Sequence, residues 1–364
     1  MTTSVKERAR PYSPTPVAEP VAVHQAGADR LAVAVIGCGY WGPNLVRNFA
    51  ACPLTAVAAI CDQDPLRTEK VAALAPQARR YRDAREALDD RGVEAVAIAT
   101  PVATHARLAA LALEAGKHVL VEKPLATSVR EAEHLVRLAS AAGRVLMVDH
   151  IFVYSPAVRK IKDLIDAGEL GEIYYIDSVR INLGLFQTDV NVIWDLAPHD
   201  LSIVDHLLGR PPRSVAAMGS SHTGGELEDV AYLNLDFGDN LLASFHVNWL
   251  SPVKVRHLIV GGSRKGLVYN DLNPWEPIKV YDRGISVTAG PEERRGLLVS
   301  YRSGDIWSPH VEQQEPLQNV VRHFAECVRS GATPMSSGEA GLRVVRILEA
   351  AQRSIKAQGG RITL

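Results

Sequence analysis

The first half of the chain alternates short apolar runs with amphipathic stretches. Runs without a polar face predict strands buried on both sides, and they are Leu31–Ile36, Leu54–Cys61, Ala95–Ala99, His118–Val121 and Val145–Val148. Between and around them, helical spacing predicts helices at Asn44–Ala50, Glu69–Ala75, Ala84–Asp89, His105–Ala115 and Ser128–Ala142. This alternation predicts a parallel sheet with helices on both faces. We place the first domain at residues 29–150.

The pattern changes in the second half. Helical spacing predicts helices at Pro156–Ala167, Trp194–Leu208, Leu317–Arg329 and Gly338–Gln358. Strand-like runs follow one another closely, which predicts an antiparallel sheet; they are Ile173–Ile181, Ser214–Met218, Ala231–Phe237, Asn240–Trp249, Lys254–Gly261, Gly266–Asn270 and Ile278–Asp282. Residues 285–316 show little periodicity. We therefore predict an α/β protein whose second domain, residues 151–364, ends in helices that pack back towards the first domain.

Composition narrows the class of protein. The chain has 364 residues, 47% of them hydrophobic, and a formal net charge of −1, so it can bury a large core but offers no electrostatic attraction to nucleic acid or to anionic membranes. No apolar run reaches the length of a membrane-spanning helix. Residues 1–28 lack a continuous apolar segment and contain Glu7 and Glu19, which predicts a disordered tail rather than a signal peptide. The four cysteines lack metal-site or disulfide spacing, so we expect a cytoplasmic protein.

A glycine pattern follows the first predicted strand. Gly37, Gly39 and Gly42 fit G-x-G-x-x-G, in which the first glycine permits a tight turn, the second lets the backbone approach a pyrophosphate, and the third allows helix and strand to pack closely. The N-terminus of the next helix supplies free N–H groups for the phosphates. A plain strand-turn-helix unit also uses glycine, so the pattern alone leaves both a dinucleotide site and a structural turn open.

The second predicted strand ends at Asp62, twenty residues beyond Gly42. A Rossmann fold places at this spacing the acid that hydrogen-bonds the adenosine ribose. A carboxylate there repels the 2′-phosphate of NADP, and no Arg follows immediately. We therefore predict NAD as the cofactor. The alternative is that Asp62 is a solvated turn residue before Pro65.

The segment TPVATHARLAALALEAGKHVLVEKPLA, residues 100–126, resembles the segment that marks the glucose-fructose oxidoreductase/inositol dehydrogenase/rhizopine-catabolism (Gfo/Idh/MocA) family. The glycine loop, the D-x-x-x-H pair at Asp195 and His199, and the EPL sequence with terminal helices at 315–358 extend the resemblance over nearly all of the chain after residue 30. The resemblance implies an oxidoreductase with an N-terminal Rossmann fold and a C-terminal α/β domain built on a large, mostly antiparallel open sheet. One sheet face would line the active site and the other would make homo-oligomer contacts, in a dimer or tetramer.

The same resemblance implies cofactor contacts by position. They are Tyr40 and Trp41 in the glycine loop, Thr100 and Pro101 at a strand end, His105 at a helix start, and Glu122 and Lys123 of the EKP sequence. A cis Lys123–Pro124 bond is also implied. From the residues alone, Trp41 is equally well a packing residue, and His105 a first-turn residue without a ligand.

Oxidation of an alcohol by NAD requires one group that holds the hydroxyl and another that accepts its proton. Lys123 follows a strand that ends at the cofactor edge, and its cation can stabilise the developing alkoxide; the alternative is a surface lysine before a turn. Asp195 and His199 are four residues apart, so a helix presents them on one face. The resemblance implies that His199 is the general base, titrating near neutrality, and that Asp195 binds a substrate hydroxyl.

Neighbouring residues leave other roles open. His206 is a competing base, and Asp200 could bond the backbone or orient the site. A metal bound by Asp195 and His199 would need a third ligand and groups that orient the ligands by hydrogen bonds, for which Asp149 and His150 are available. Because a nicotinamide already accepts the hydride, we predict no metal.

Candidates for substrate contact are Arg180, Asn182 and Asn191, each of which could instead be a polar residue of the protein surface. The GYWG and DVNVIWDLAPHD segments resemble members that act on nucleotide-linked or amino sugars. We predict an NAD-dependent dehydrogenase that oxidises a secondary hydroxyl of such a sugar, at C3, to a ketone. The alternatives are an NAD(P)H-dependent ketosugar reductase, an inositol or aminoglycoside dehydrogenase and, outside enzymes, a catalytically silent NAD-binding sensor.

Overall fold

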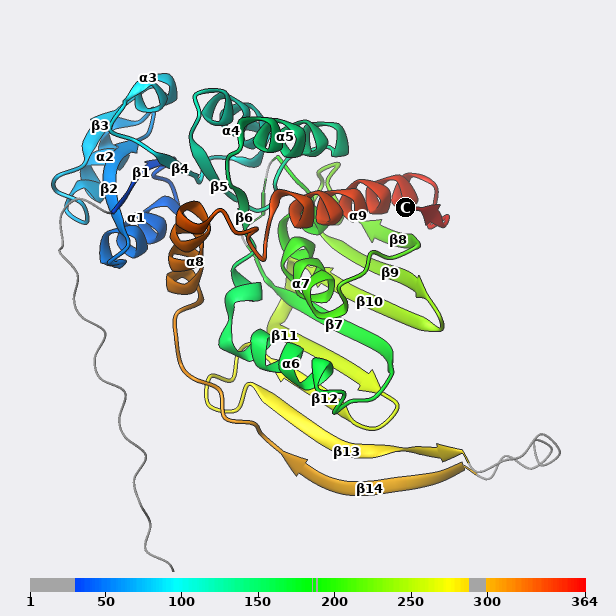
Figure 1. The fold of residues 1–364 in the computed structure, drawn as a ribbon. Helices are drawn as coiled ribbons and strands as arrows, with labels where there is room; N and C mark the ends of the chain where they lie inside the picture. Colours follow the sequence, from blue (N-terminus) through cyan, green and yellow to red (C-terminus); the bar gives the residue numbers. More distant parts are fainter. Residues whose placement is uncertain (1–29, 185, 188, 288–298) are drawn as a thin grey trace, which may run out of the picture.

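The computed structural model describes residues 30–184, 186–187, 189–287 and 299–364. The expected disordered tail at residues 1–28 lies outside these residues. Within them, a six-stranded sheet and a nine-stranded sheet stand beside each other, with helices packed between and around them (Figure 1). The fold is α/β, as predicted.

The first sheet has the strand order β3-β2-β1-β4-β5-β6, and its neighbouring strands pair in parallel. Its strands are β1 (Leu31–Ile36), β2 (Thr55–Cys61), β3 (Arg79–Tyr81), β4 (Ala95–Ile98), β5 (His118–Glu122) and β6 (Leu146–Asp149). The connecting helices are α1 (Gly42–Ala51), α2 (Pro65–Ala72), α3 (Ala84–Asp89), the short η1 (Val102–Thr104), α4 (His105–Glu114) and α5 (Val129–Ala142). This is the Rossmann order, in which ligands bind beyond the carboxyl ends of β1 and β4, where the winding reverses.

The second sheet has the order β14-β13-β12-β11-β7-β10-β9-β8-β15. Its strands are β7 (Ile173–Leu183), β8 (Ser214–Ser220), β9 (Val230–Gly238), β10 (Leu241–Asn248), β11 (Leu250–Gly262), β12 (Gly266–Asn270), β13 (Ile278–Val287), β14 (Val299–Trp307) and β15 (Ile362–Thr363). Among these described strands the β7–β10 pair is parallel and the other pairs are antiparallel. The prediction of a large, mostly antiparallel open sheet is confirmed.

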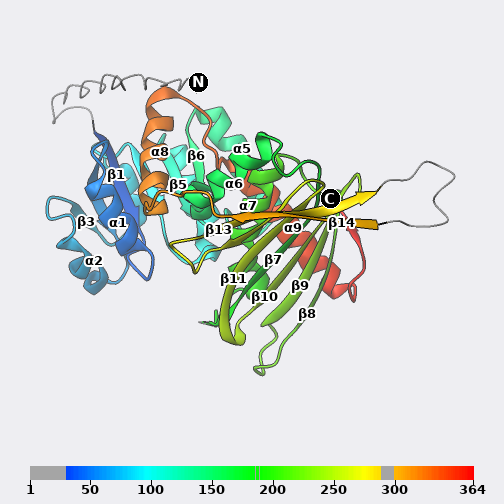
Figure 2. The same cartoon turned by 90° about the horizontal axis from the view of Figure 1, so that it is seen from below.

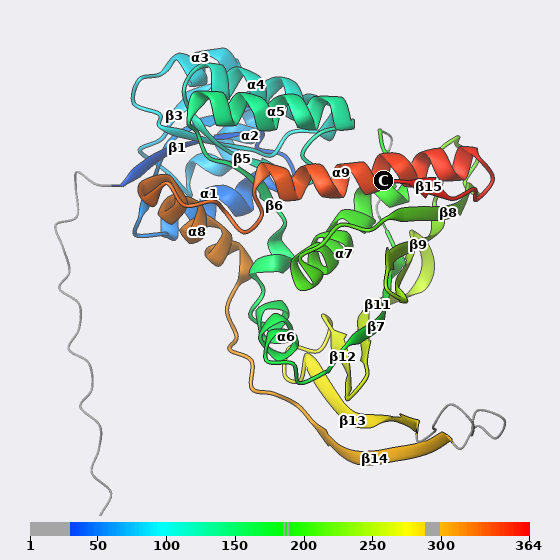
Figure 3. The same cartoon turned by 45° about the vertical axis from the view of Figure 1, so that its right-hand side comes forward.

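Five further helical segments follow the first sheet along the chain in the described residues: η2 (Ile151–Tyr154), α6 (Pro156–Asp166), α7 (Val192–Leu208), α8 (Pro316–Ser330) and α9 (Gly338–Lys356). The helices α7 and α9 pack on one face of the sheet, as Figure 3 shows. The opposite face carries large apolar side chains that are exposed, namely Tyr175, Met218, Tyr232, Leu242 and Ile259.

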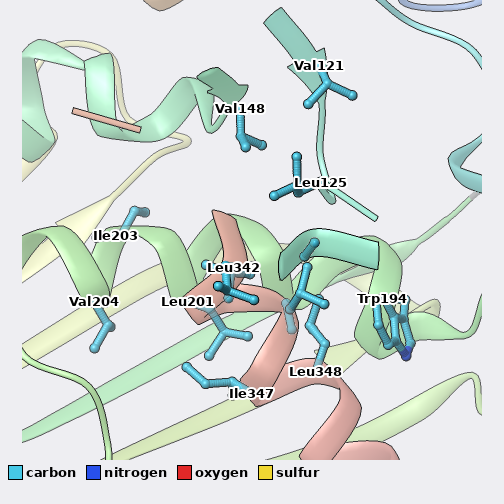
Figure 4. Close-up of a cluster of buried hydrophobic side chains, with 14 of the residues drawn as sticks. Val121, Leu125, Val148, Trp194, Leu201, Ile203, Val204, Leu342, Ile347 and Leu348 are labelled. Carbon is cyan, nitrogen blue, oxygen red and sulfur yellow. The ribbon is translucent and has the colours of Figure 1, made fainter. Parts of the chain in front are cut away.

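The two sheets share one hydrophobic core. Figure 4 shows Val121 of β5, Val148 of β6 and Leu125 facing side chains of α7 and α9 such as Leu201 and Leu342. The approach is close, because a Cβ on Gly341 would lie 2.6 Å from a methyl group of Val148. Since buried side chains hold α7 against the ends of β5 and β6, residues that follow β5 meet residues of α7 in a fixed geometry.

The helix α8 returns to the first sheet. It packs against α1 (Figure 2), where the Phe49 and Phe324 rings lie edge to face at 6.5 Å between centroids. Just before α8, Glu315 of the EPL sequence forms two hydrogen bonds with the Arg47 guanidinium. The α1 side of the first sheet is thus covered by a segment from the far end of the chain.

Some elements differ from the sequence prediction. The short strands β3 and β15 were not predicted, since RRY at Arg79–Tyr81 has no apolar pattern and a two-residue edge strand leaves no signal. The helix α2 begins at Pro65, not at Glu69, because Asp64 caps it by accepting from the Leu66 N–H. The strands β13 and β14 cover part of residues 285–316, where the sequence shows little periodicity. They are the last two strands at one edge of the nine-stranded sheet, and they pair mainly with each other.

Candidate active site

A cavity of about 1040 Å³ runs along the carboxyl ends of the parallel strands. One end is lined by the glycine loop after β1 and by Asp62 after β2. The other end is lined by Lys123 after β5 and by Trp194 and Asp195 of α7. The cavity therefore joins the edge where a Rossmann sheet binds its ligand to the second half of the chain.

The glycines of the loop each meet a different constraint. A Cβ on Gly37, whose φ is +96°, would lie 2.7 Å from the Ala99 backbone, and a Cβ on Gly42 would lie 2.0 Å from the Gly37 carbonyl oxygen. A Cβ on Gly39 would instead point into the cavity, with its nearest neighbour a guanidinium nitrogen of Arg67 at 3.6 Å. Trp41, the N-cap of α1, makes no side-chain cap. Pro43 has no N–H, and the Asn44 and Leu45 N–H groups donate to the Trp41 carbonyl oxygen, so Gly42 supplies the N–H of this first turn that can meet a phosphate.

Asp62 lies at the cavity wall with its carboxylate fixed by backbone. Its Oδ2 accepts from the Cys38 N–H at 2.8 Å, and its Oδ1 accepts from the Asp64 N–H at 2.9 Å. The Arg67 guanidinium lies 3.9 Å from Oδ2, a neighbour that the immediate sequence after Asp62 did not reveal. Further arginines that line this end are Arg82, Arg85 and Arg107. The rim that was predicted to repel a 2′-phosphate thus also carries positive charge.

Thr100, Pro101 and His105 line the middle of the cavity. His105 is buried, and its Nδ1 and Nε2 each lie 2.8 Å from a backbone carbonyl oxygen, that of Pro124 and that of Thr100 respectively. Burial lowers the pKa of His105, and a neutral ring can donate to one of these carbonyls at a time. We therefore withdraw His105 as a direct cofactor ligand, because it ties the end of β4 to the turn after β5.

Lys123 reaches across to the second half of the chain. Its Nζ donates to the Asp195 carbonyl oxygen at 2.7 Å and to Asp195 Oδ1 at 3.0 Å. Asp195 Oδ2 accepts from the Trp249 indole N–H at 3.1 Å. The Lys123–Pro124 peptide bond is cis. Sequence reasoning proposed Lys123 and Asp195 separately; Trp249 was missed, since nothing in its position after β10 signals a contact with α7.

His199 follows Asp195 one turn later on α7, which continues through Pro198. Its ring lies edge to face with Phe152 at 5.1 Å between centroids, and its Nδ1 is buried without a partner among the described residues. Burial, together with the positive charge of Lys123, holds the pKa of His199 well below 6.5. The expected titration near neutrality is corrected: the ring is neutral at neutral pH and ready to accept a proton. Neither His199 nor the competing base His206 is among the residues that line the cavity, but His199 lies one turn from Asp195, whereas His206 lies in the last turn of α7.

Two of the three proposed substrate contacts have protein partners. Arg180 is buried, and its Nε and one terminal nitrogen donate to the Asp200 carboxylate at 2.7 and 2.9 Å. Asn191 caps α7 by accepting from the Trp194 N–H, while its amide donates to Glu228 and Gln352. We therefore withdraw Arg180 and Asn191 as substrate ligands.

The third candidate stays a prediction. Asn182 follows Arg180 by two residues on β7 and is half-buried, so it lies on the sheet face that α7 covers. On the same face, Arg256 of β11 stands opposite Arg180 of β7 in the strand register and donates to Asp271 at 2.9 Å. Sequence reasoning passed over Arg256 because strand pairing alone brings it to this face.

Buried polar atoms without partners gather around Lys123. Among the described residues they include Glu122 Oε1, Asp149 Oδ1, both ring nitrogens of His150, and His199 Nδ1. Native proteins satisfy most buried polar atoms, so such a cluster marks a place where chemistry or a ligand is accommodated. In the part of the chain that the structure describes, no group of three His, Cys, Asp or Glu side chains is arranged to hold a metal ion.

Comparison with known proteins identifies the two halves. Residues 31–150 match the family described as "Oxidoreductase family, NAD-binding Rossmann fold", and residues 158–268 match the GFO/IDH/MocA C-terminal domain. No helix in the described residues is both long and apolar enough to cross a membrane.

Three relatives illustrate the range of the similarity. The UDP-N-acetylglucosamine 3-dehydrogenase of Acidithiobacillus ferrooxidans is 32% identical over 85% of this chain and 93% of its own; its structure has a TM-score of 0.74, with 26% identity over 90% of this chain and 98% of that one. The scyllo-inositol 2-dehydrogenase (NADP(+)) of Bacillus subtilis is 27% identical over 80% of this chain and 84% of its own. GenD2 from gentamicin A biosynthesis, in complex with NAD, has a TM-score of 0.77 and 25% identity over 94% and 99% of the two chains. The chain therefore belongs to the GFO/IDH/MocA family of oxidoreductases.

Proposed function

We propose that the chain is an NAD-dependent dehydrogenase that oxidises a secondary hydroxyl of a nucleotide-linked or amino sugar, at C3, to a ketone. The observation that carries this proposal is the contact of Lys123 Nζ with Asp195 Oδ1, 3.0 Å apart, at the far end of the cavity that begins at the glycine loop. The cation and the carboxylate at this end of the cavity, with the neutral His199 one turn further along α7, are the groups that alcohol oxidation needs.

The residues at the near end fit a dinucleotide. Gly39 leaves open space where a pyrophosphate would lie at the N-terminus of α1, and Asp62 lies where the adenosine ribose is bound in Rossmann folds. Tyr40, Thr100 and Pro101 line the same cavity. When bound, the nicotinamide supplies the acceptor for the hydride that leaves the substrate carbon.

The far end supplies the proton chemistry. Lys123 donates a hydrogen bond to the reacting oxygen in place of one of its bonds to Asp195, and it stabilises the negative charge that develops on this oxygen. Asp195, held by the Trp249 N–H, binds a neighbouring hydroxyl. His199 accepts the hydroxyl proton, since its depressed pKa keeps the ring neutral. The C–H bond gives its electron pair as hydride and the O–H bond gives its proton, which leaves a ketone.

The substrate class rests on the relatives. One relative is named as acting on UDP-N-acetylglucosamine, and another belongs to gentamicin A biosynthesis. Inositols are the second candidate, since the chain also resembles a scyllo-inositol 2-dehydrogenase that uses NADP. The arginines around Asp62 favour testing NADP beside NAD.

We also infer a homo-oligomer that buries the uncovered face of the nine-stranded sheet. Its exposed Met218, Tyr232 and Leu242 lie on neighbouring strands, and an apolar patch of this kind marks an interface. The four cysteines are free and buried, which supports a reducing compartment such as the cytoplasm.

The experiment is a substrate panel. The purified protein is mixed with NAD or NADP and with nucleotide sugars, amino sugars, aminoglycosides or inositols, and the absorbance of the reduced cofactor is recorded. The proposal predicts reduction of NAD with a nucleotide or amino sugar and a 3-keto product by mass spectrometry. Turnover with inositols alone would mean that the substrate is an inositol and not a nucleotide-linked or amino sugar. NAD binding without turnover of any compound in the panel would favour a sensor.

A further inference from the structure

Two carboxyl groups lie side by side beneath the nicotinamide end of the cavity. Glu122 ends β5 and Asp149 ends β6, and the two residues stand opposite each other in the register of these parallel strands. Asp149 is 2% exposed. Glu122 Oε1 and Asp149 Oδ1 are both enclosed, and neither receives a hydrogen bond from an N–H or O–H group of the described residues.

The other oxygen of each carboxyl group contacts the active site. Asp149 Oδ2 accepts from the Trp41 indole N–H at 3.3 Å, and Glu122 Oε2 accepts from the Lys123 backbone N–H at 3.2 Å. One contact fixes a ring of the glycine loop, and the other fixes the backbone of the residue that is to hold the substrate oxygen. We propose that Glu122 and Asp149 share one proton and act as a positioning pair, which holds Trp41 and Lys123 in place at the nicotinamide end of the cavity.

Two neighbouring carboxylates without water cannot both stay charged. Burial and the Asp149 charge raise the pKa of Glu122 well above 4.5, and burial raises the pKa of Asp149 to about 6. The proton therefore resides on Glu122, whose hydroxyl donates to the Asp149 carboxylate. With this bond both enclosed oxygens have a partner, and Asp149 accepts from Glu122 and Trp41 together.

Other titratable groups face the pair from the surrounding elements. Lys123 lies at the end of β5, and its charge opposes the rise in the Glu122 pKa. Beside Asp149 lie His150, whose pKa burial lowers to about 3, and Tyr154 of η2, whose pKa burial raises. His150 and Tyr154 are both neutral near neutral pH and add no charge there. The loss of the shared proton is therefore an ionisation of the carboxyl pair itself.

The pH dependence follows from the sign of the shifts. A carboxyl group with a raised pKa favours the folded state most at low pH, and this contribution is lost as pH rises through its folded pKa. In wild type the melting temperature should therefore fall as pH rises from the ordinary range of a glutamate towards the folded pKa of Glu122, and NAD affinity should fall as Glu122 ionises. Glu122→Gln keeps one N–H donor for Asp149 and one oxygen for the Lys123 N–H, but it cannot ionise.

The test compares wild type with Glu122→Gln. Between about pH 6 and about pH 9 the melting temperature of wild type should fall relative to Glu122→Gln by about 2 °C or more, and only wild type should lose NAD affinity over this range. Infrared spectra at neutral pH should show a protonated carboxyl band in wild type that Glu122→Gln lacks. Glu228→Gln, at a half-buried carboxylate that bonds Asn191 and Gln352, is the matched control and should keep the wild-type slope.

Parallel pH slopes in wild type and Glu122→Gln, or a wild-type spectrum without the carboxyl band, would overturn the shared proton. Equal alkaline loss of NAD affinity in the two proteins would overturn the positioning role even if the band is present. The inference rests on the proposed nicotinamide site, but none of these measurements needs a sugar substrate. Its failure is therefore distinguishable from a failure of the proposed reaction.

Discussion

The two ends of the cavity are built in different ways. The cofactor end consists of glycines, helix N–H groups and Asp62, all within one strand-helix-strand stretch of the chain. The substrate end joins Lys123, which follows β5, with Asp195 and His199 of α7 and with Trp249, which follows β10. Backbone and local turns define the first end, whereas packing between distant segments defines the second.

The charges at the two ends differ as well. At the cofactor end, Arg67 is 54% exposed and stands 3.9 Å from Asp62, so it is available to a phosphate. At the substrate end Lys123 is largely enclosed and lies 3.0 Å from its carboxylate partner Asp195. We infer that substrate binding replaces a short contact of Lys123 with Asp195, whereas a phosphate at the cofactor end would meet Arg67 over its longer contacts with Asp62 and Asp64.

The largest effect is expected where a pair is buried. Arg180→Met leaves the Asp200 carboxylate buried and unpaired, so the free energy of unfolding should fall by about 3–5 kcal/mol. Urea unfolding measures it. Arg256→Met is the control, because Arg256 is partly exposed and its pair with Asp271 should contribute less. If both variants lost the same small amount of unfolding free energy, Arg180 would not be held by Asp200 and would be available to bind the substrate.

The next effect concerns the proton acceptor. His199→Asn keeps the approximate size of the side chain but removes the base, so kcat should fall on the order of 10²-fold. In wild type kcat/KM should rise with pH through an ionisation below 6.5, because the pKa of His199 is depressed; the variant should lack this limb. Steady-state kinetics across pH measures both. An unchanged kcat would make His199 structural and move the base role to Lys123.

A smaller effect is expected at the cofactor rim. NAD should bind at least tenfold more tightly than NADP, about 1.4 kcal/mol, because Asp62 repels a 2′-phosphate. Asp62→Asn should narrow this ratio, and Arg67→Ala should widen it by weakening NADP. Titration of both cofactors by calorimetry decides the matter. Tighter binding of NADP than of NAD by wild type would show that Asp62 does not select against the 2′-phosphate and that the arginines at the rim bind it instead.

The smallest effect on stability is expected outside the cavity. Met218→Lys, on the uncovered sheet face where Met218 is 67% exposed, should change the free energy of unfolding of a subunit by only about 0.5 kcal/mol. The mass in solution, measured by light scattering, should nevertheless fall, since a charge is placed in the proposed interface. An unchanged oligomer would exclude this face.

The cofactor end could be predicted because its signal is local. Gly37, Gly39, Gly42 and Asp62 keep fixed spacings that the fold requires; the structure places Gly37, Gly39 and Asp62 on the cavity wall, and Gly42 packs against the Gly37 carbonyl. Most strands and helices were also predicted within a few residues, since apolar periodicity marks them. The polar edge strand β3 and the paired strands β13 and β14 escaped, because partners outside the local pattern stabilise them.

The substrate end was predictable only in part. Lys123, Asp195 and His199 stand in recognisable motifs, but the bond from Trp249 and the pairing of Arg180 with Asp200 depend on how β7, β10 and α7 pack. The depressed pKa of His199 likewise follows from burial, which a sequence does not display. Polar residues on a strand reveal a site only after their partners are known.

The separation of the two ends is tested most directly by Lys123→Ala. NAD binding and the rate of NADH formation with the substrate found in the panel are measured on the same preparation of this variant and of wild type. NAD affinity should stay within about threefold, because the glycine loop and Asp62 are intact, while kcat should fall on the order of 10²-fold or more. A variant that binds NAD as wild type does and still reduces it at the wild-type rate would show that Lys123 does not hold the reacting oxygen.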